Sequence, residues 1–242
     1  MTFTLPSSSV IHAVRSSTVM RVRVVVANPP FRSNQTNRYN SPERYRLIVI
    51  TSTRDRQPQV GNAAKHKDNL VRTTMRLFRR QGYASTGLQQ VLAESGAPKG
   101  SLYHYFPNGK ESLGEAAVDL AGGLVADLLE ELAAKHAQPR AFVQAYCKAM
   151  AGWMKESDFR SGCPIATTML ETAPQSASIT AAGVRAIDRW IEIIAGVLTR
   201  AGEKPRDAGA RAQLVISAME GALLLARVRQ STKPIMDVAR LV

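Results

Sequence analysis

The sequence has little cysteine, no long apolar run and few acidic residues in its first third. Two cysteines in 242 residues, Cys147 and Cys163, exclude a disulfide-rich secreted scaffold and a zinc ribbon, and they fit the reducing cytoplasm. No run of 18 or more apolar residues occurs, so the sequence predicts no membrane span and no membrane partner. Because 45% of the residues are hydrophobic, the chain can still build a sizeable core.

The scarcity of acidic residues is confined to one end. Residues 1–67 contain 11 Lys and Arg against 2 Asp and Glu, residues 68–110 contain 6 against 2, and residues 111–242 contain 15 of each. The whole net charge of +13 therefore belongs to the first 110 residues. A polyanion is expected to bind there, whereas the balanced remainder needs a different role.

Residues 1–66 lack any helical apolar period and are rich in Ser, Arg, Asn and Pro. This composition predicts a basic, disordered extension, or translation from a start codon placed too far upstream. A transit peptide is an alternative, although no clean amphipathic helix supports it. A tail that adds non-specific DNA affinity is another. The predicted domains are this extension, a second unit at 67–110 and a third at 111–242.

From Asp68 onward the apolar spacing is helical, and no convincing strand follows. Three short helices come first. The first ends at Gly82, the second begins at a Thr86–Gln89 capping box, and the third covers about residues 99–106. Gly96, which is free to adopt a positive φ, lies in the tight turn between the last two.

Three short helices with a Gly-containing turn are typical of a helix-turn-helix unit, whose third helix enters the major groove of DNA. Leu102 and Phe106 are expected to face inward as core. The small and cationic residues before Leu102 favour close approach to phosphate. The predicted DNA-binding residues are Thr86, Gly87, Pro98, Lys99, Gly100, Ser101, Tyr103, His104, Tyr105 and Lys110.

Longer helices are predicted in the rest of the chain. Asn108 and Glu111 have the spacing of another N-cap pair. The helix that follows is expected to bury a stripe that includes Leu113, Leu124 and Leu128. The predicted helices are about 110–132, from Pro139 onward, 165–171, about 176–200, about 206–228 and a short one after Pro234.

The run from Gly96 to Glu111, GAPKGSLYHYFPNGKE, closely resembles the motif of the TetR family, and its Pro-Lys-Gly-Ser variant resembles the LmrA/YxaF branch. The resemblance is looser after residue 111 and does not include residues 1–66. It implies an all-α fold with an N-terminal three-helix helix-turn-helix DNA-binding domain and a C-terminal helical ligand-binding and dimerisation domain.

The resemblance also implies a function. Family members are homodimers joined through a four-helix bundle, here within about Ile179–Leu198 and Ala208–Val228, and ligand binding moves the helix after the DNA-binding unit, here Lys110–Leu132. The expected protein is a cytoplasmic, ligand-responsive repressor that binds a palindromic double-stranded DNA operator and is released by a small hydrophobic effector. Known ligands of this branch include flavonoids and antibiotics, so aromatic effectors are candidates.

The expected helix at about 206–228 carries a stripe of small residues, which are Ala218, Gly221, Ala222 and Ala226. Such a stripe would let two helices approach closely across a dimer interface, although burial of the helix within its own subunit is the alternative. The predicted interface residues are Ala218, Gly221, Ala222 and Leu224.

Met and aromatic side chains suit a ligand pocket that adapts to its ligand, although a place in the ordinary hydrophobic core is the alternative for each residue. The predicted ligand-binding residues are Phe142, Tyr146, Met150, Trp153, Cys163, Met169 and Trp190.

The residues alone also bear on three other functions: an electrophile sensor, an enzyme and an architectural DNA-binding protein. A thiol at a helix N-terminus is expected to have a lowered pKa, so Cys163 is also a candidate electrophile sensor. An enzyme is not expected, because no His has a partner at metal-ligand spacing and no phosphate-binding loop occurs; we predict no catalytic residue, metal or cofactor. An architectural DNA-binding protein would need only the basic extension, and would show little sequence preference.

Overall fold

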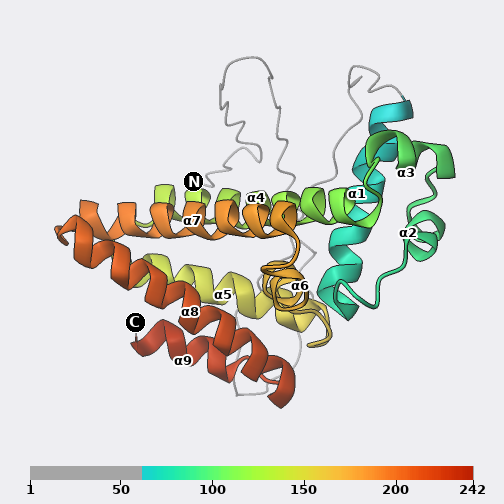
Figure 1. Ribbon diagram of the computed structural model, residues 1–242. Helices are drawn as coiled ribbons and strands as arrows, with labels where there is room; N and C mark the ends of the chain where they lie inside the picture. Colours follow the sequence, from blue (N-terminus) through green and yellow to red (C-terminus); the bar gives the residue numbers. More distant parts are fainter. Residues whose placement is uncertain (1–61, 242) are drawn as a thin grey trace, which may run out of the picture. The chain divides into compact units, whose positions relative to one another are not determined.

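The computed structural model describes residues 62–241. The predicted extension lies almost entirely outside these residues. Within them the chain is all-helical and no strand occurs, as predicted. The helices are α1 Asn62–Gln81, α2 Leu88–Ser95, α3 Lys99–Tyr105, α4 Lys110–Lys135, α5 Pro139–Glu156, α6 Pro164–Thr172, α7 Ala177–Arg200, α8 Pro205–Arg229 and α9 Lys233–Leu241 (Figure 1).

The first helix begins at Asn62, six residues before the predicted start at Asp68. Its extra turns were missed because Ala64, Lys65 and Lys67 are exposed, and periodicity reports only the residues that a helix buries. Buried side chains appear from Leu70 onward.

Two capping predictions were wrong. The N-cap of α2 is Gly87, not Thr86, and it makes no side-chain cap. The Thr86 hydroxyl instead donates to the Gly82 carbonyl at 2.7 Å. Likewise α4 begins after Gly109, with φ +61°, and not at Asn108. At Gly109 the cap position has a positive φ, which glycine adopts at little steric cost. Gly87 has an ordinary extended backbone with φ −88°, so its conformation does not itself require glycine.

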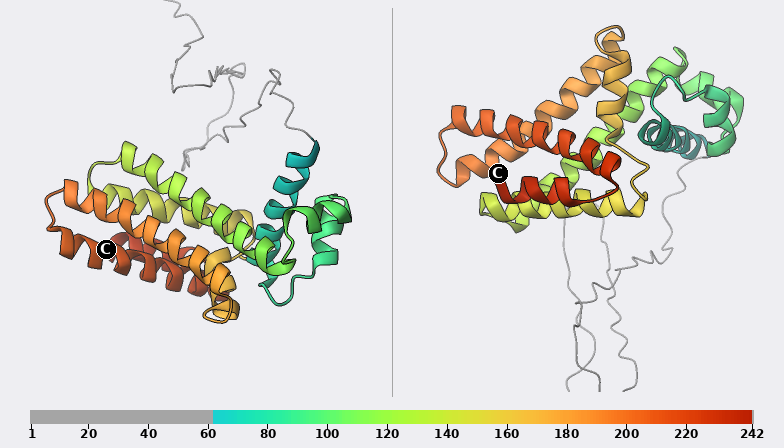
Figure 2. Two further views of the ribbon diagram at one scale, coloured as in Figure 1. Left: turned by 45° about the horizontal axis from the view of Figure 1, so that its top comes forward. Right: turned by 90° about the horizontal axis from the view of Figure 1, so that it is seen from below.

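Helices α1–α3 and the start of α4 enclose a small apolar core. It contains Leu77 of α1, Val91 of α2, Leu102 of α3 and Leu113 of α4. Both views of Figure 2 place this three-helix unit at one end of α4. The small core fixes α3 to α1 and leaves the opposite face of α3 open.

The remaining helices share a larger core, in which α4 and α7 run side by side (Figure 1). Their close approach depends on small residues: a Cβ atom added at Gly122 would lie 2.5 Å from the Ala186 Cβ. The predicted leucine stripe of α4 is therefore only partly correct, since Leu113 is buried but Leu124 is 40% exposed. Near the crossing with α7, the buried residues of α4 are Ala121 and Gly122, while Leu113, Val118 and Leu129 are buried elsewhere along the helix.

Helix α8 packs on α5, α7 and α9. Among residues 62–241 it is also the one helix long and apolar enough, by length and composition alone, to cross a membrane. The sequence expectation concerned an unbroken run of 18 apolar residues, and α8 contains none, because Arg211 and Glu220 interrupt it. A core helix meets the same criteria, and Ala212, Val215 and Met219 of α8 are buried within this chain.

Candidate DNA-binding surface and ligand cavity

Helix α3 has a buried side and an exposed side. Leu102 and Phe106 are 0% and 3% exposed and lie in the small core, as predicted. Lys99, at the start of the helix, and His104 are exposed, and Tyr103 is 49% exposed. The fold therefore offers a cation, an imidazole and a phenol on one open helical surface, which suits contacts to phosphates and base edges.

The predicted DNA-binding residues do not all lie on this surface. Gly87, Pro98 and Gly100 are exposed and Ser101 is half-buried. Tyr105 is half-buried because its ring packs against the small core, with its centroid 4.8 Å from that of His104.

The prediction for Thr86 was wrong. Its side chain is buried, its hydroxyl donates to the Gly82 carbonyl, and its N–H donates to the Tyr83 carbonyl at 3.0 Å. Both of its hydrogen-bond donors are thus used inside the protein, and its role is to close the turn between α1 and α2.

Lys110 is half-buried and engaged within the protein. Its Nζ donates to the Ala84 carbonyl at 3.2 Å and lies 4.4 Å from the centroid of the Tyr83 ring. Burial lowers the pKa of Lys110, and Glu171 partly opposes this shift. The ammonium therefore ties the start of α4 to the turn after α1, and a contact to phosphate at this position stays a prediction.

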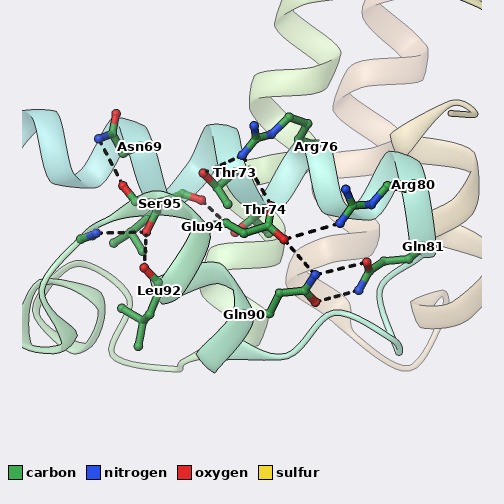
Figure 3. A network of polar contacts seen from close by, with 12 residues as sticks. Asn69, Thr73, Thr74, Arg76, Arg80, Gln81, Gln90, Leu92, Glu94 and Ser95 are labelled. Carbon is green, nitrogen blue, oxygen red and sulfur yellow. Dashed lines mark hydrogen bonds and ion pairs between the residues drawn. The ribbon is translucent and has the colours of Figure 1, made fainter. Parts of the chain in front are cut away.

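A polar network holds α2 against α1 (Figure 3). Glu94 pairs with Arg76 at 3.8 Å and with Arg80 at 3.5 Å, and Gln81 donates to Gln90 at 2.9 Å. Exposed ion pairs stabilise little individually. Because several converge on one carboxylate, however, they restrict how α2 can rotate on α1, and hence where the turn places α3.

The larger core contains a cavity of about 190 Å³. Helices α1, α4, α5, α7 and α8 and the segment before α6 contribute to its wall. The lining residues are Met75, Arg79, Ala121, Leu124, Val125, Tyr146, Met150, Trp153, Met154, Gly162, Cys163, Pro164, Trp190, Glu220 and Leu223. The predicted residues Tyr146, Met150, Trp153, Cys163 and Trp190 are among them.

Two predicted ligand-binding residues do not line this cavity. Phe142 is 1% exposed and lies within the larger core, and Met169 packs where a Cβ atom of Gly183 would otherwise lie. Sequence reasoning also missed Met75 and Arg79, because their place in α1 pointed to the DNA-binding unit alone.

The polar groups of the cavity are few and mostly uncharged. Trp190 Nε1 donates to the Gly122 carbonyl at 2.9 Å. Burial raises the pKa of the Glu220 carboxyl, while a hydrogen bond with Cys163 opposes that shift. Burial, reinforced by Glu220, raises the pKa of Tyr146 well above its ordinary value.

The expected acidification of Cys163 was wrong. The residue is the N-cap of α6, and its sulfur accepts from the Ala166 N–H at 3.5 Å. Burial in the cavity wall, followed by the charge of Glu220, nevertheless raises the pKa of the thiol well above its ordinary value. Desolvation therefore outweighs the helix terminus, and the thiolate that an electrophile sensor needs is scarce.

The segment that contains α6 connects the cavity to α1. The Gly162 N–H donates to the Arg79 carbonyl at 3.1 Å, and Arg79 Nε donates back to the Gly162 carbonyl at 3.4 Å. The Thr167 hydroxyl donates to the Phe78 carbonyl at 3.3 Å. At the other end of α6, Glu171 accepts from the Ala84 N–H. The end of α1 is thus bonded to the cavity wall at Gly162, and the turn after α1 is bonded to the far end of α6.

Helix α8 exposes apolar side chains on one side. Leu214, Leu224 and Val228 are 59%, 63% and 74% exposed, and Gly221 between them is exposed. Val184 on the neighbouring α7 is 53% exposed.

The residues predicted for the dimer interface do not all lie on this exposed side of α8. Ala218 is half-buried and stays compatible with it, but Ala222 and Ala226 are 4% and 0% exposed and pack within their own chain. Periodicity merged two sides of α8, because both carry small or apolar residues.

No group of three or more His, Cys, Asp or Glu side chains that could hold a metal ion occurs in residues 62–241. An exposed third helix on a compact three-helix core, with a separate cavity, defines a helix-turn-helix DNA-binding regulator.

Comparison with known proteins identifies the family. Residues 70–117 match the family described as bacterial regulatory proteins, tetR family. Residues 139–241 match the domain described as transcriptional regulator LmrA/YxaF-like, C-terminal domain. The chain belongs to the TetR family of transcriptional regulators, which are DNA-binding proteins and not enzymes.

Individual relatives agree with this. The chain is 32% identical over 173 residues to the uncharacterised HTH-type transcriptional regulator YxaF of Bacillus subtilis, covering 72% of this chain and 91% of YxaF. It is 35% identical over 179 residues to an uncharacterised HTH-type transcriptional regulator of Mycobacterium tuberculosis, covering 72% and 90%. The crystal structure of regulatory protein TetR from Rhodobacter sphaeroides matches with a TM-score of 0.64 and 25% identity, covering 72% and 94%.

Proposed function

We propose that this protein is a ligand-responsive repressor. As a homodimer it binds a palindromic operator in double-stranded DNA, and a small hydrophobic effector that enters the cavity releases it. It acts in the bacterial cytoplasm, where its operator lies. The single observation that carries this proposal is the composition of the cavity wall, which includes Met75 and Arg79 of α1. The helix that supports α3 therefore also contacts whatever occupies the cavity.

Binding to DNA rests on the exposed side of α3. Lys99 and Tyr103 project from it, and no carboxylate pairs with Lys99 among the described residues. Selection of binding sites from a random DNA library with the full chain should yield a two-fold symmetric sequence. That site should bind at least about a thousandfold more tightly than random DNA.

Point variants separate specific from charge-driven binding. Lys99→Ala should lower the slope of log affinity against log salt by about two, because the proposed dimer loses one phosphate contact in each subunit. Tyr103→Ala should weaken binding to the selected site more than to random DNA. The control is Lys155→Ala, which removes the same charge from an exposed position on α5. Equal affinity for all sequences would favour an architectural DNA-binding protein instead.

Dimerisation rests on the apolar side of α8. An isolated chain that exposes Leu214, Leu224 and Val228 together leaves a continuous apolar strip in water. A second copy related by a two-fold axis would cover it, with α7 and α8 of both chains forming a four-helix bundle. Leu224→Arg should convert the dimer to a monomer in sedimentation. Leu241→Arg, at an equally apolar and 77% exposed position on α9, should not.

Release by an effector rests on the contacts between the cavity and the turn after α1. Both α4, which follows the DNA-binding unit, and α6, which is bonded to Phe78 and Ala84, link the two regions. A ligand that displaces either helix would change the spacing of the two α3 helices in the dimer. An effector should therefore weaken binding to the selected site and leave the weaker binding to random DNA nearly unchanged.

A further inference from the structure

We propose that the cavity binds a small aromatic carboxylate, about one substituted ring in size, and that Arg79 is the residue that recognises its carboxylate group. The inference rests on the proposed effector-responsive function and names the chemical class of the effector.

The size of the cavity limits the ligand. Its volume is about 190 Å³, and an engineered apolar cavity of about 150 Å³ in another protein holds one benzene molecule. One ring with a short side chain therefore fits. Compounds with several fused or linked rings, such as the flavonoids expected from the family resemblance, would have to extend beyond this volume through the open side of the cavity.

The surface of the cavity favours an aromatic body. Trp153, Trp190 and Tyr146 contribute flat aromatic faces from two helices, and Met75 and Met150 add polarisable thioethers. Aromatic rings gain from stacked and edge contacts with such side chains. The indole N–H of Trp190 is already bonded to the Gly122 carbonyl, so that ring is held in one orientation.

The charge at one end of the cavity favours an anion. Arg79 is the one cationic side chain in the lining, and its guanidinium lies 5.9 Å from the centroid of the Trp153 ring. No carboxylate pairs with it in residues 62–241, and its one side-chain hydrogen bond there is the long contact to Gly162. Most of its five N–H groups thus stay available for a bidentate contact with a carboxylate.

A second guanidinium lies beside the same point of the wall. A Cβ atom built on Gly162 would be 3.7 Å from Arg227 Nη1, and within the described residues Arg227 has no ion pair either. Arg227 is exposed and is not part of the cavity lining. It adds positive charge near Gly162, where the carboxylate contact is proposed, and no acidic side chain in the described residues pairs with it.

Glu220 is the one carboxyl group in the lining, and burial raises its pKa. The carboxyl therefore holds a proton more readily than an exposed glutamate does, which weakens its opposition to an anion. A cationic ligand would share the cavity with the guanidinium of Arg79, and the amine probe below tests that alternative.

Three probes of equal shape test the inference. The full chain is titrated with hydrocinnamate, with its neutral amide and with phenylpropylamine. The readout is tryptophan emission, because both tryptophans of the chain line the cavity. Hydrocinnamate should bind at least about tenfold more tightly than the amide, as expected for a charge-assisted contact. Equal binding of acid and amide, or tightest binding of the amine, would overturn the inference.

Variants assign the preference to one residue. Arg79→Gln should abolish the difference between acid and amide, and Arg79→Lys should restore part of it. Arg160→Gln, which removes an exposed arginine only two residues from Gly162, should keep the full difference. Retention of the preference in a folded Arg79→Gln protein would refute the role of Arg79.

Binding to the selected DNA site is measured separately and without ligand. If the full chain binds that site specifically but hydrocinnamate neither binds nor releases it, the ligand class is wrong and the repressor function stands. If the full chain shows no sequence preference for DNA, the proposed function itself fails, whatever hydrocinnamate does.

Discussion

The crossing of α4 and α7 gives a sharp test of the packing. A Cβ atom at Gly122 would lie 2.5 Å from the Ala186 Cβ and 3.4 Å from the Ala186 Cα. Neither neighbour can rotate away, because one is a methyl group and the other is backbone. Gly122→Ala therefore forces the two helices apart, which costs about 1–3 kcal/mol. Alanine in place of glycine in a helix returns up to about 1 kcal/mol, so the net loss of stability is about 1 kcal/mol.

The adjacent glycine provides a matched control. Gly123 is in the same helix, is exposed, and has no atom within 4 Å of an added Cβ. Gly123→Ala should therefore gain up to about 1 kcal/mol from helix propensity alone. The difference between the two variants isolates the steric contact, because the chemical change is identical. Adding Ala186→Gly to Gly122→Ala removes the opposing methyl group and should recover much of the loss.

Urea unfolding at one fixed protein concentration measures these effects, since dimer stability depends on concentration. The midpoint should fall for Gly122→Ala and rise for Gly123→Ala. If both variants shift it upward by the same amount, α4 and α7 do not approach as closely as described. Tryptophan emission should change only in Gly122→Ala, because Trp190 donates to the Gly122 carbonyl.

Three further predictions concern single groups. Burial raises the pKa of Glu220 from 4.5, so the folded chain holds this proton more tightly than the unfolded chain does. The free energy of unfolding therefore falls as the pH rises above the pKa of the unfolded chain. In urea unfolding at about pH 5 and about pH 8, Glu220→Gln should become more stable relative to the parent protein at the higher pH, and a difference that stays constant contradicts this. Burial raises the pKa of Cys147 to about 11 and that of Cys163 well above its ordinary value. Iodoacetamide at neutral pH should therefore label both thiols slowly until the chain unfolds, and rapid labelling of the native protein would exclude such burial. Gly96→Ala should cost about 1 kcal/mol in thermal unfolding, because Gly96 has φ +64° with no atom near an added Cβ; an unchanged midpoint would show that the turn has another backbone.

The helices after residue 110 could be predicted closely because proline and glycine punctuate them. Helix α8 was expected at about 206–228 and occurs at Pro205–Arg229, between the positive-φ Gly202 and the left-handed Gln230. The inner side of α4 was harder. Leucine periodicity indicated Leu124 as buried, but the close approach of α7 requires glycine and alanine there. Periodicity assumes that large residues face the core, and a tight helix pair reverses this.

The cavity could be predicted only in part. Its aromatic residues stand out in the sequence of α5 and α7, but which side chains border a space depends on how five helices cross. Arg79 was therefore counted with the DNA-binding unit. Glu220 gives a weak signal that sequence reasoning did not use, since it is the one acidic residue among the apolar residues 212–226 of α8.

The position of Arg79 bears on how an effector could act. A ligand shifts an equilibrium between two conformations only if it binds them with different affinity. Arg79 and Met75 belong to α1 and would move with α3, whereas Trp153 and Tyr146 belong to α5. A ligand held by both sets fits best at one placement of α1 relative to α5. Any rotation of the DNA-binding unit therefore alters the ligand's own contacts, and the effector and the operator compete through the placement of a single helix.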